Sequence, residues 1–178
     1  MSAGHALLGL LADGERHGYD LRRQYRRRFP AAKPLAAAQI YATLERLLRD
    51  GLVAAGATER AGGPDRTVFA VTGPGRAELE RWLSEVEVPS EYVANLLAMK
   101  VTLALLVADQ KTAADFLRRQ RVAHLVRMRE HTRVKSDPDA DVLRVIAADY
   151  AINHLDADLR WIDTTLQRVS QLAKEIRP

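Results

Sequence analysis

Residues 36–53 read AAAQIYATLERLLRDGLV, and this stretch decides the fold. Its apolar side chains recur at the three- and four-residue spacing of one helix face and are Ile40, Leu44, Leu47 and Leu48. We therefore predict a helix from about Ala36 to Asp50 that ends at Gly51. The other face of this helix carries mostly small or polar side chains, which leaves it to solvent or to a partner.

Shorter elements surround this helix on both sides. Two helices are predicted before it, at residues 5–12 and at about 19–29. After it, the apolar segments 52–54 and 67–71 flank a turn-forming tip at 61–65, AGGPD, which indicates a β-hairpin.

A fourth helix follows the hairpin and is predicted to run through Leu83. Thr72 is placed to cap its start, and Pro74 is tolerated in its first turn. The order helix, helix, helix, hairpin, helix is that of a winged helix-turn-helix with a two-stranded β wing. We therefore predict a mainly α chain whose residues 1–85 form a winged helix-turn-helix DNA-binding domain.

The remaining residues, 86–178, are predicted to form an all-helical dimerisation and sensing domain. Its first helix starts near Ser90 and has an apolar stripe at Tyr92, Leu96, Met99, Leu103 and Leu106. A second helix runs from about Asp109 to Lys135, and the last runs from Asp141 to about Ile176.

The last predicted helix has a seven-residue apolar repeat in two registers. One register is Val145, Ile152, Leu159, Leu166 and Ala173, and the other is Ala148, Leu155, Ile162, Val169 and Ile176. A helix of roughly 50 Å, at about 1.5 Å per residue, is longer than a domain of this size covers alone. We therefore predict that a second copy of the chain covers this seam. The predicted dimerisation residues are Val145, Ile152, Leu155, Leu159, Ile162, Leu166 and Val169.

Positive charge is concentrated in the first half of the chain. The 178 residues contain 27 Lys and Arg against 23 Asp and Glu, a formal net charge of +4. Residues 1–82 hold 13 basic and 9 acidic side chains, whereas residues 83–178 hold 14 of each. From Arg22 to Arg49, eight basic residues stand against one acid, Glu45. Such a cluster attracts a polyanion, and we expect double-stranded DNA.

The second and third helices carry groups that suit the two kinds of DNA contact. On the third helix, Arg46 suits guanine or a phosphate, Gln39 suits adenine, and the small Ala42 suits a thymine methyl group. Arginines of the second helix and of the hairpin suit phosphates or a minor groove. Solvated helix faces, local salt bridges and an ordinary exposed hairpin are the alternatives. The predicted DNA-binding residues are Tyr19, Arg22, Arg23, Arg26, Arg27, Ala38, Gln39, Ala42, Thr43, Arg46, Arg49, Arg60 and Arg66.

Catalysis and metal binding find little support in the sequence. The chain has no cysteine, which excludes disulfides, thiolate zinc sites and cysteine nucleophiles. No two histidines stand three or four residues apart, and His154 with Asp158 lacks a third metal ligand. We expect no enzyme activity, no cofactor and no metal. Because no apolar run approaches the ~20 residues of a membrane span, we expect a cytoplasmic protein without membrane contact.

Aromatic residues of the second half define a speculative effector site. Tyr150, His154 and Trp161 share a face of the last predicted helix that lies off the heptad seam, and Tyr92 and Met99 belong to the first helix of that half. These five residues are the candidates to bind a small-molecule effector. The alternative is that they pack against neighbouring helices, as aromatic stripes commonly do.

Seven short segments of the first half occur together in one known family. They are Leu8-Gly9-Leu10-Leu11, His17-Gly18-Tyr19-Asp20-Leu21, Gln39-Ile40-Tyr41, Leu44-Glu45-Arg46-Leu47, Asp50-Gly51-Leu52-Val53, Gly62-Gly63-Pro64-Asp65-Arg66, and Thr72 through Gly75-Arg76-Ala77-Glu78-Leu79 to Trp82-Leu83. Together they resemble the PadR family of bacterial transcriptional regulators over most of residues 5–83. The second half is similar to the longer, virulence-activator-like branch of that family, mainly through Tyr150 to Trp161.

The resemblance implies a homodimer that binds an inverted-repeat operator through the third helix and the wing. It also implies a repressor that a small effector, often aromatic, releases from DNA. This chain departs from the family at Ala36, Ala38 and Ala42, where the family tends to have Ser, Gly and Pro, and at Phe69, which replaces a tyrosine. The start of the third helix is therefore expected to lack its cap. A winged-helix module that binds an acidic protein surface is the alternative function.

Overall fold

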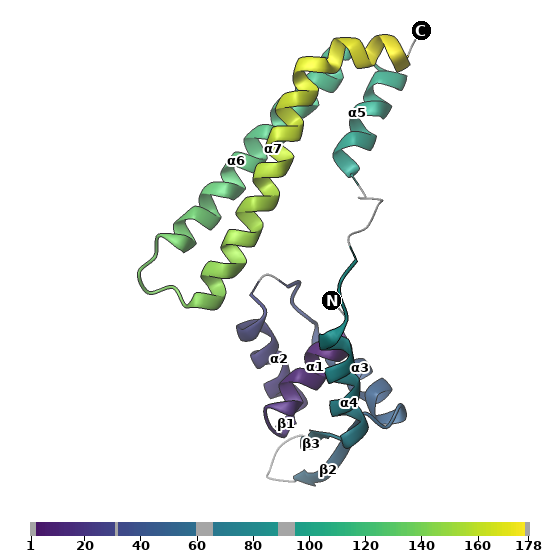
Figure 1. Cartoon of the computed structure of the whole chain (residues 1–178), viewed down its shortest axis with the longest axis vertical. Coiled ribbons are helices and arrows are strands. Elements are labelled where there is room, and N and C mark those ends of the chain that lie inside the picture. Colours follow the sequence, from purple (N-terminus) through teal and green to yellow (C-terminus); the bar gives the residue numbers. More distant parts are fainter. Residues whose placement is uncertain (1–2, 31, 60–65, 89–94, 177–178) are drawn as a thin grey trace. The chain divides into compact units, whose positions relative to one another are not determined.

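The computed structural model of the chain describes residues 3–30, 32–59, 66–88 and 95–176 (Figure 1). The chain divides into two compact units, Met1–Val88 and Pro89–Pro178. The first unit contains α1 (Ala3–Ala12), β1 (Arg16–His17), α2 (Gly18–Arg28), α3 (Ala37–Arg49), β2 (Val53–Glu59), β3 (Arg66–Val71) and α4 (Gly73–Ser84). The second contains α5 (Leu96–Val107), α6 (Gln110–Lys135) and α7 (Val142–Ile176). The predicted mainly helical architecture with a small antiparallel sheet is confirmed.

Helix α1 forms the centre of the first hydrophobic core. Its buried side chains are Ala6, Leu7, Leu8, Leu10 and Leu11. Leu21 of α2 and Ile40 of α3 are fully buried in the same core. Burial of such a side chain stabilises a fold by about 1.5–3 kcal/mol. The predicted buried stripe of α3 is confirmed, since Leu44 and Leu47 are buried beside Ile40 and Leu48 packs against them.

The sheet of the first unit has three strands in the order β1-β3-β2, all antiparallel. The predicted two-stranded wing is confirmed as the β2–β3 hairpin, and β1 is a third strand that was not predicted. Arg16 pairs with Phe69 and His17 with Val68, so β1 adds two residues to the edge of β3. A strand this short has no alternating pattern that a sequence could show. It is held by its backbone pairing and by the Arg16 side chain, which donates to the Leu10 carbonyl oxygen at 3.1 Å.

The start of α4 packs tightly against the end of α3. Thr72 caps α4 as predicted, because its hydroxyl oxygen accepts from the Gly75 N–H at 3.1 Å. The same hydroxyl donates to the Gly51 carbonyl oxygen at 2.7 Å, and the Thr72 N–H donates to the Leu52 carbonyl oxygen at 3.1 Å. A Cβ atom on Gly75 would lie 2.0 Å from that Leu52 oxygen, so only glycine fits this first turn.

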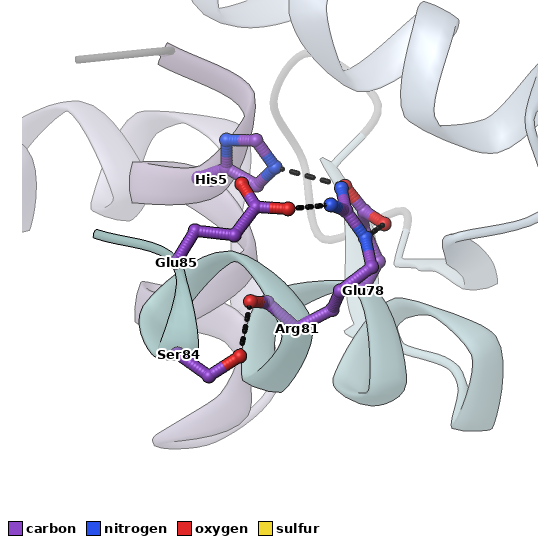
Figure 2. Close-up of polar contacts among 5 residues, drawn as sticks. All are labelled: His5, Glu78, Arg81, Ser84 and Glu85. Carbon is purple, nitrogen blue, oxygen red and sulfur yellow. Dashed lines mark hydrogen bonds and ion pairs between the residues drawn. The ribbon is translucent and has the colours of Figure 1, made fainter. Parts of the chain in front are cut away.

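A polar and aromatic contact joins α1 to α4 (Figure 2). The His5 ring stacks on Trp82 with a centroid distance of 4.6 Å, and its Nε2 lies 3.1 Å from Glu78 Oε1. Arg81 pairs with Glu78 at 2.7 Å and also with Glu85. Hydrogen bonds from Arg81, and next from His5, lower the pKa of Glu78 to about 2.

The second unit is a helical hairpin, with α6 and α7 side by side along most of their length, together with the shorter α5 (Figure 1). Its core contains Val101, Leu105, Ala113, Ala114, Leu117, Ile162 and Val169. The bounds of α6 and α7 agree with the prediction to within one residue. None of the described helices is long and apolar enough to cross a membrane.

Part of the heptad seam of α7 is buried within the chain itself, and its coverage by a second protomer stays a prediction. Leu159 is 8% exposed, Ile162 is 0% exposed and Val169 is 5% exposed. The last two pack in the core that α5 and α6 provide. Helix α6 has 26 residues, which is long enough to face most of α7, so it covers one side of the repeat. Four predicted dimerisation residues are half-buried: Val145, Ile152, Leu155 and Leu166.

Within this chain, helix α5 buries a face other than its predicted apolar stripe. It begins at Leu96, with Asn95 as its N-cap, and Ser90 and Tyr92 lie outside the described residues. Val101 and Leu105 are buried. The predicted stripe is instead exposed at Leu96, Met99, Leu103 and Leu106. Apolar residues occur all round this helix, so the sequence alone did not determine which face would be buried.

We predict that Gly75→Ala destabilises the chain, whereas Gly73→Ala on the same turn does not. The new methyl group meets the Leu52 carbonyl in the first case and nothing within 4 Å in the second. Overpacking of this kind costs about 1–3 kcal/mol. Urea unfolding of both variants gives the comparison. Equal free energies of unfolding for the two would contradict the close approach of α4 to Leu52.

We predict that Glu78→Gln removes part of the acid sensitivity of folding. Because the pKa of Glu78 falls from its ordinary 4.5 to about 2 on folding, its carboxylate stabilises the fold above about pH 4.5. That contribution is lost as the pH falls toward 2. The Tm difference between wild type and Glu78→Gln should therefore shrink over this range. Exposed Glu80, on the same helix, is the control, and an identical pH profile for Glu80→Gln would contradict the assignment.

Candidate nucleic-acid interface

Helix α2 has one face in the core and one cationic face. Leu21 and Tyr25 are buried, whereas the arginines of the other face are exposed. The exposed face forms a shallow hollow of about 390 Å³. The residues around this hollow are Tyr19, Arg22, Arg23, Arg26 and Arg27. All five were predicted as DNA contacts, and the structure brings them together on one surface.

Carboxylates of the chain neutralise little of this charge. Arg23 pairs with Asp20 at 2.9 Å, and Arg28 pairs with Asp13 at 3.3 Å. The arginines of α2 without a carboxylate partner in the described part of the chain are Arg22, Arg26 and Arg27. Their mutual repulsion is relieved when an external anion binds, and closely spaced phosphates provide such an anion.

Helix α3 presents a mixed face of small, polar and charged residues. The exposed side chains are Ala38, Gln39, Tyr41, Ala42, Glu45, Arg46 and Arg49. Among the described residues, Arg46 has no ion-pair partner, and Arg49 approaches Asp50 at 3.9 Å. Thr43 is half-buried at the flank, and its hydroxyl donates to the Gln39 carbonyl oxygen at 2.7 Å. Small side chains on the exposed face let a helix enter a major groove deeply.

Gln39 binds the backbone at the start of α3, where Ala36 offers no capping side chain. Ala36 has no side-chain acceptor, and Gln39 Oε1 accepts a hydrogen bond from the Ala36 N–H at 2.9 Å. The Ala36 carbonyl in turn accepts from the N–H groups of Gln39 and Ile40, at 3.1 and 3.2 Å. The expectation that position 36 lacks a side-chain cap is confirmed, and the bond from the Ala36 N–H to Gln39 is an additional contact at the helix start. A capping-box pattern needs Ser or Thr three residues before the glutamine, so the sequence did not show this bond.

A hollow of about 660 Å³ opens where α2 begins, beside α3 and β3. The polar side chains on its wall are His17, Tyr19, Asp20, Arg23, Tyr41, Glu45 and Thr67. Tyr41 and Glu45 were not predicted as site residues, although they stand one helical turn apart on the exposed face. A Cβ atom on Gly18 would lie 2.7 Å from the Tyr41 ring, so this glycine allows α2 to begin directly against Tyr41.

The predicted wing contacts are not part of the described surface. Arg60 lies outside the described residues. Arg66 begins β3, opposite Glu59, but its side chain is outside the described part of the structure.

The predicted effector residues that the structure describes are spread over the second unit. Tyr92 lies outside the described residues, and Met99 is exposed on α5. The Tyr150 and His154 rings are 4.1 Å apart on the surface of α7. Trp161 packs against the core and borders a hollow of about 400 Å³. Eleven residues of helix, about 16 Å, separate it from Tyr150. No three described His, Asp or Glu side chains are grouped to hold a metal ion.

Comparison with known proteins is consistent across sequence and fold. Residues 7–81 match the Transcriptional regulator PadR-like family. The probable transcriptional regulator Rv1176c of Mycobacterium tuberculosis is 35% identical over 85 residues, 48% of this chain and 45% of that protein. The negative transcriptional regulator PadR of Bacillus subtilis is 26% identical over 116 residues, 65% of this chain and 63% of that protein. The matched segments thus span less than two thirds of either relative.

Two crystal structures of Bacillus subtilis PadR share the fold. The complex with operator DNA has a TM-score of 0.71 at 20% identity and covers 93% of this chain and 98% of that one. The complex with p-coumaric acid has a TM-score of 0.72 at 19% identity, covering 94% and 98%. Both relatives are named as transcriptional regulators. Residues 7–81, less than half of the chain, thus match the PadR-like family of transcriptional regulators.

Proposed function

We propose that this chain is a homodimeric repressor that binds an inverted-repeat operator and is released from it by a small effector. Residues 1–85 bind DNA, and residues 86–178 dimerise and sense the effector. The observation that carries the proposal is the cationic face of α2, whose Arg22, Arg26 and Arg27 have no carboxylate partner in the described residues. The similar PadR of Bacillus subtilis is named a negative regulator and binds operator DNA.

The two helices divide the work of binding in this proposal. Tyr19 and the arginines of α2 contact phosphates, which supply affinity and register without reading bases. Helix α3 enters the major groove, where Arg46 meets guanine and Ala42 meets a thymine methyl group. Arg49 contacts the backbone at the end of the same helix. The hollow beside α3, with the Tyr41 and Tyr19 side chains on its wall, receives the sugar-phosphate strand that borders the groove.

The dimer presents two copies of this surface. Two recognition helices must stand about 34 Å apart to enter successive major grooves on one side of the duplex. Large apolar side chains that the chain leaves exposed support association. On α5 these are Leu96, Met99, Leu103, Leu106 and Val107, and on α7 they are Val142, Leu143, Ile146 and Tyr150.

The effector is proposed to act through the second unit. The similar PadR binds p-coumaric acid, an aromatic acid. In this chain the exposed Tyr150 and His154 pair offers an aromatic surface, and Trp161 borders a separate hollow. A ligand shifts a dimer equilibrium only if it binds one arrangement of the helices more tightly than the other. Loss of the DNA-binding arrangement then releases the operator.

We predict different effects of Arg46→Ala and Arg22→Ala on operator binding. Loss of a base contact at Arg46 should reduce the preference for one base at one position of each half-site. The free energy that discriminates between bases there should fall by about 1–3 kcal/mol. Loss of a phosphate contact at Arg22 should weaken all sequences alike and reduce the salt slope by about one for each contact. Gel shifts with DNA selected from a random pool, at several salt concentrations, measure both effects.

Arg129→Ala is the matched control for these variants, because Arg129 is exposed on α6 and has no ion-pair partner in the described residues. It removes the same charge outside the first unit and should leave binding unchanged. If both single variants, Arg46→Ala and Arg22→Ala, bind the operator with wild-type affinity, the proposed DNA interface is contradicted. An acidic protein partner is then favoured.

We predict that Met99→Glu separates the dimer, whereas Val122→Glu does not. Both side chains are 61% exposed, so neither change should unfold the chain. Met99 lies among the exposed apolar residues of α5, and a buried carboxylate at an interface is costly. Sedimentation equilibrium measures the change. If Met99→Glu forms dimers with the wild-type dissociation constant, α5 is not part of the interface.

A further inference from the structure

We propose that Gln39 reads the operator as a hydrogen-bond donor, so that it prefers guanine or thymine to adenine. The inference rests on the proposed function and names the base class that one residue recognises. It reverses the pairing with adenine that the residue type alone suggests.

The amide of Gln39 is already engaged by the helix that carries it. Its Oε1 accepts the Ala36 N–H at 2.9 Å. The assignment of oxygen to this position is set by chemistry, because a backbone N–H is a donor and an amide nitrogen would oppose it. Ala36 offers no side-chain oxygen, so this bond is the side-chain contact that holds the N-cap backbone of α3. The backbone carbonyl of Gln39 is used as well, by the Thr43 hydroxyl at 2.7 Å.

The other half of the amide is free. Gln39 is exposed, and its Nε2 has no hydrogen-bond partner in the described part of the chain. Gln39 also occupies the third position of α3, in the first turn, where recognition helices contact base edges. The group offered to the groove is therefore an NH₂ with two donors.

Adenine recognition by glutamine needs both amide atoms at once. The oxygen accepts from adenine N6 while the nitrogen donates to N7. In this chain one lone pair of the oxygen is already taken by the Ala36 N–H, so an adenine contact would require Oε1 to accept two hydrogen bonds at once. The amide NH₂ suits guanine best, because O6 and N7 are two adjacent acceptors, and it also suits O4 of thymine, whereas adenine offers only N7 beside the N6 donor.

Two substitutions separate the backbone bond of Gln39 from its contact with DNA. Gln39→Glu keeps an oxygen that accepts the Ala36 N–H, and its charge is favourable at a helix N-terminus, but it has no donor. Gln39→Met keeps the length of the side chain and removes both the acceptor and the donor. Gln24→Glu, on neighbouring α2, adds the same negative charge outside the recognition helix and is the matched control.

The stability readout tests this backbone bond in the full-length chain. We expect Gln39→Met to lower the Tm by about 2–4 °C, the effect of losing one such bond in a chain of this size. We expect Gln39→Glu to keep the wild-type Tm. Equal Tm values for wild type and Gln39→Met would overturn the backbone bond and, with it, the reason for a donor contact.

The binding readout uses duplexes selected from a random pool and resynthesised with each base at every half-site position. We expect the wild type to prefer guanine or thymine over adenine, by about fivefold in Kd, at one position. Gln39→Met should lose that preference, and Gln39→Glu should shift it toward cytosine or adenine. Gln24→Glu should weaken all duplexes equally.

The outcomes separate this inference from the proposed function. A wild-type preference for adenine at the position that Gln39→Met alters would overturn the inference and leave the repressor intact. If Gln39→Met leaves the base preference unchanged at every position of the half-site, the inference is also overturned and the repressor remains. Failure of the wild type to select any duplex would overturn the proposed function, whatever the Tm values show.

Discussion

Burial of Ile40, Leu44 and Leu47 beneath α1 and α2 sets the rotation of α3 about its own axis, and every group on its outer face takes its position from that packing. Successive residues of a helix differ by about 100°, so a change in the buried stripe would move Arg46 away from the outer face. Truncating one such buried leucine to alanine typically costs about 2–5 kcal/mol. The orientation of the outer face therefore depends on buried contacts whose loss would lower the free energy of unfolding considerably.

Local electrostatics accounts for some arginines of α2 and not for others. Arg26 and Arg27 lie in the last turn, where the helix dipole stabilises a cation by about 0.3–1 kcal/mol. That gain offsets the repulsion of like charges four residues apart, which is about 0.2–0.5 kcal/mol per pair. Arg22 faces Arg26 across one turn and lies too far from the helix end to share the gain. Its position without a carboxylate partner in the described residues is the strongest local sign that α2 meets an external anion.

The sequence predicted the features that follow from periodic burial or from a residue type at a set position. It missed features that depend on the path of the backbone. The stripe of α3 and the Thr72 cap follow rules of spacing and residue type, and both were confirmed. Strand β1 was missed because two residues show no periodicity, and they form a strand because β3 presents a free edge. On α3, the sequence identified Gln39 as an exposed polar residue, but its bond to Ala36 depends on the local path of the backbone.

The heptad repeat of α7 shows why periodicity does not identify its own partner. An a/d seam requires an apolar surface of matching length, and α6 provides it with 26 residues against the 35 of α7. The side chains that remain exposed near the start of α7, Leu143, Ile146 and Tyr150, belong to neither register of the seam. This end of the helix is thus apolar on two faces, of which α6 covers one. The dimer that we propose therefore buries the off-seam face of α7 together with α5.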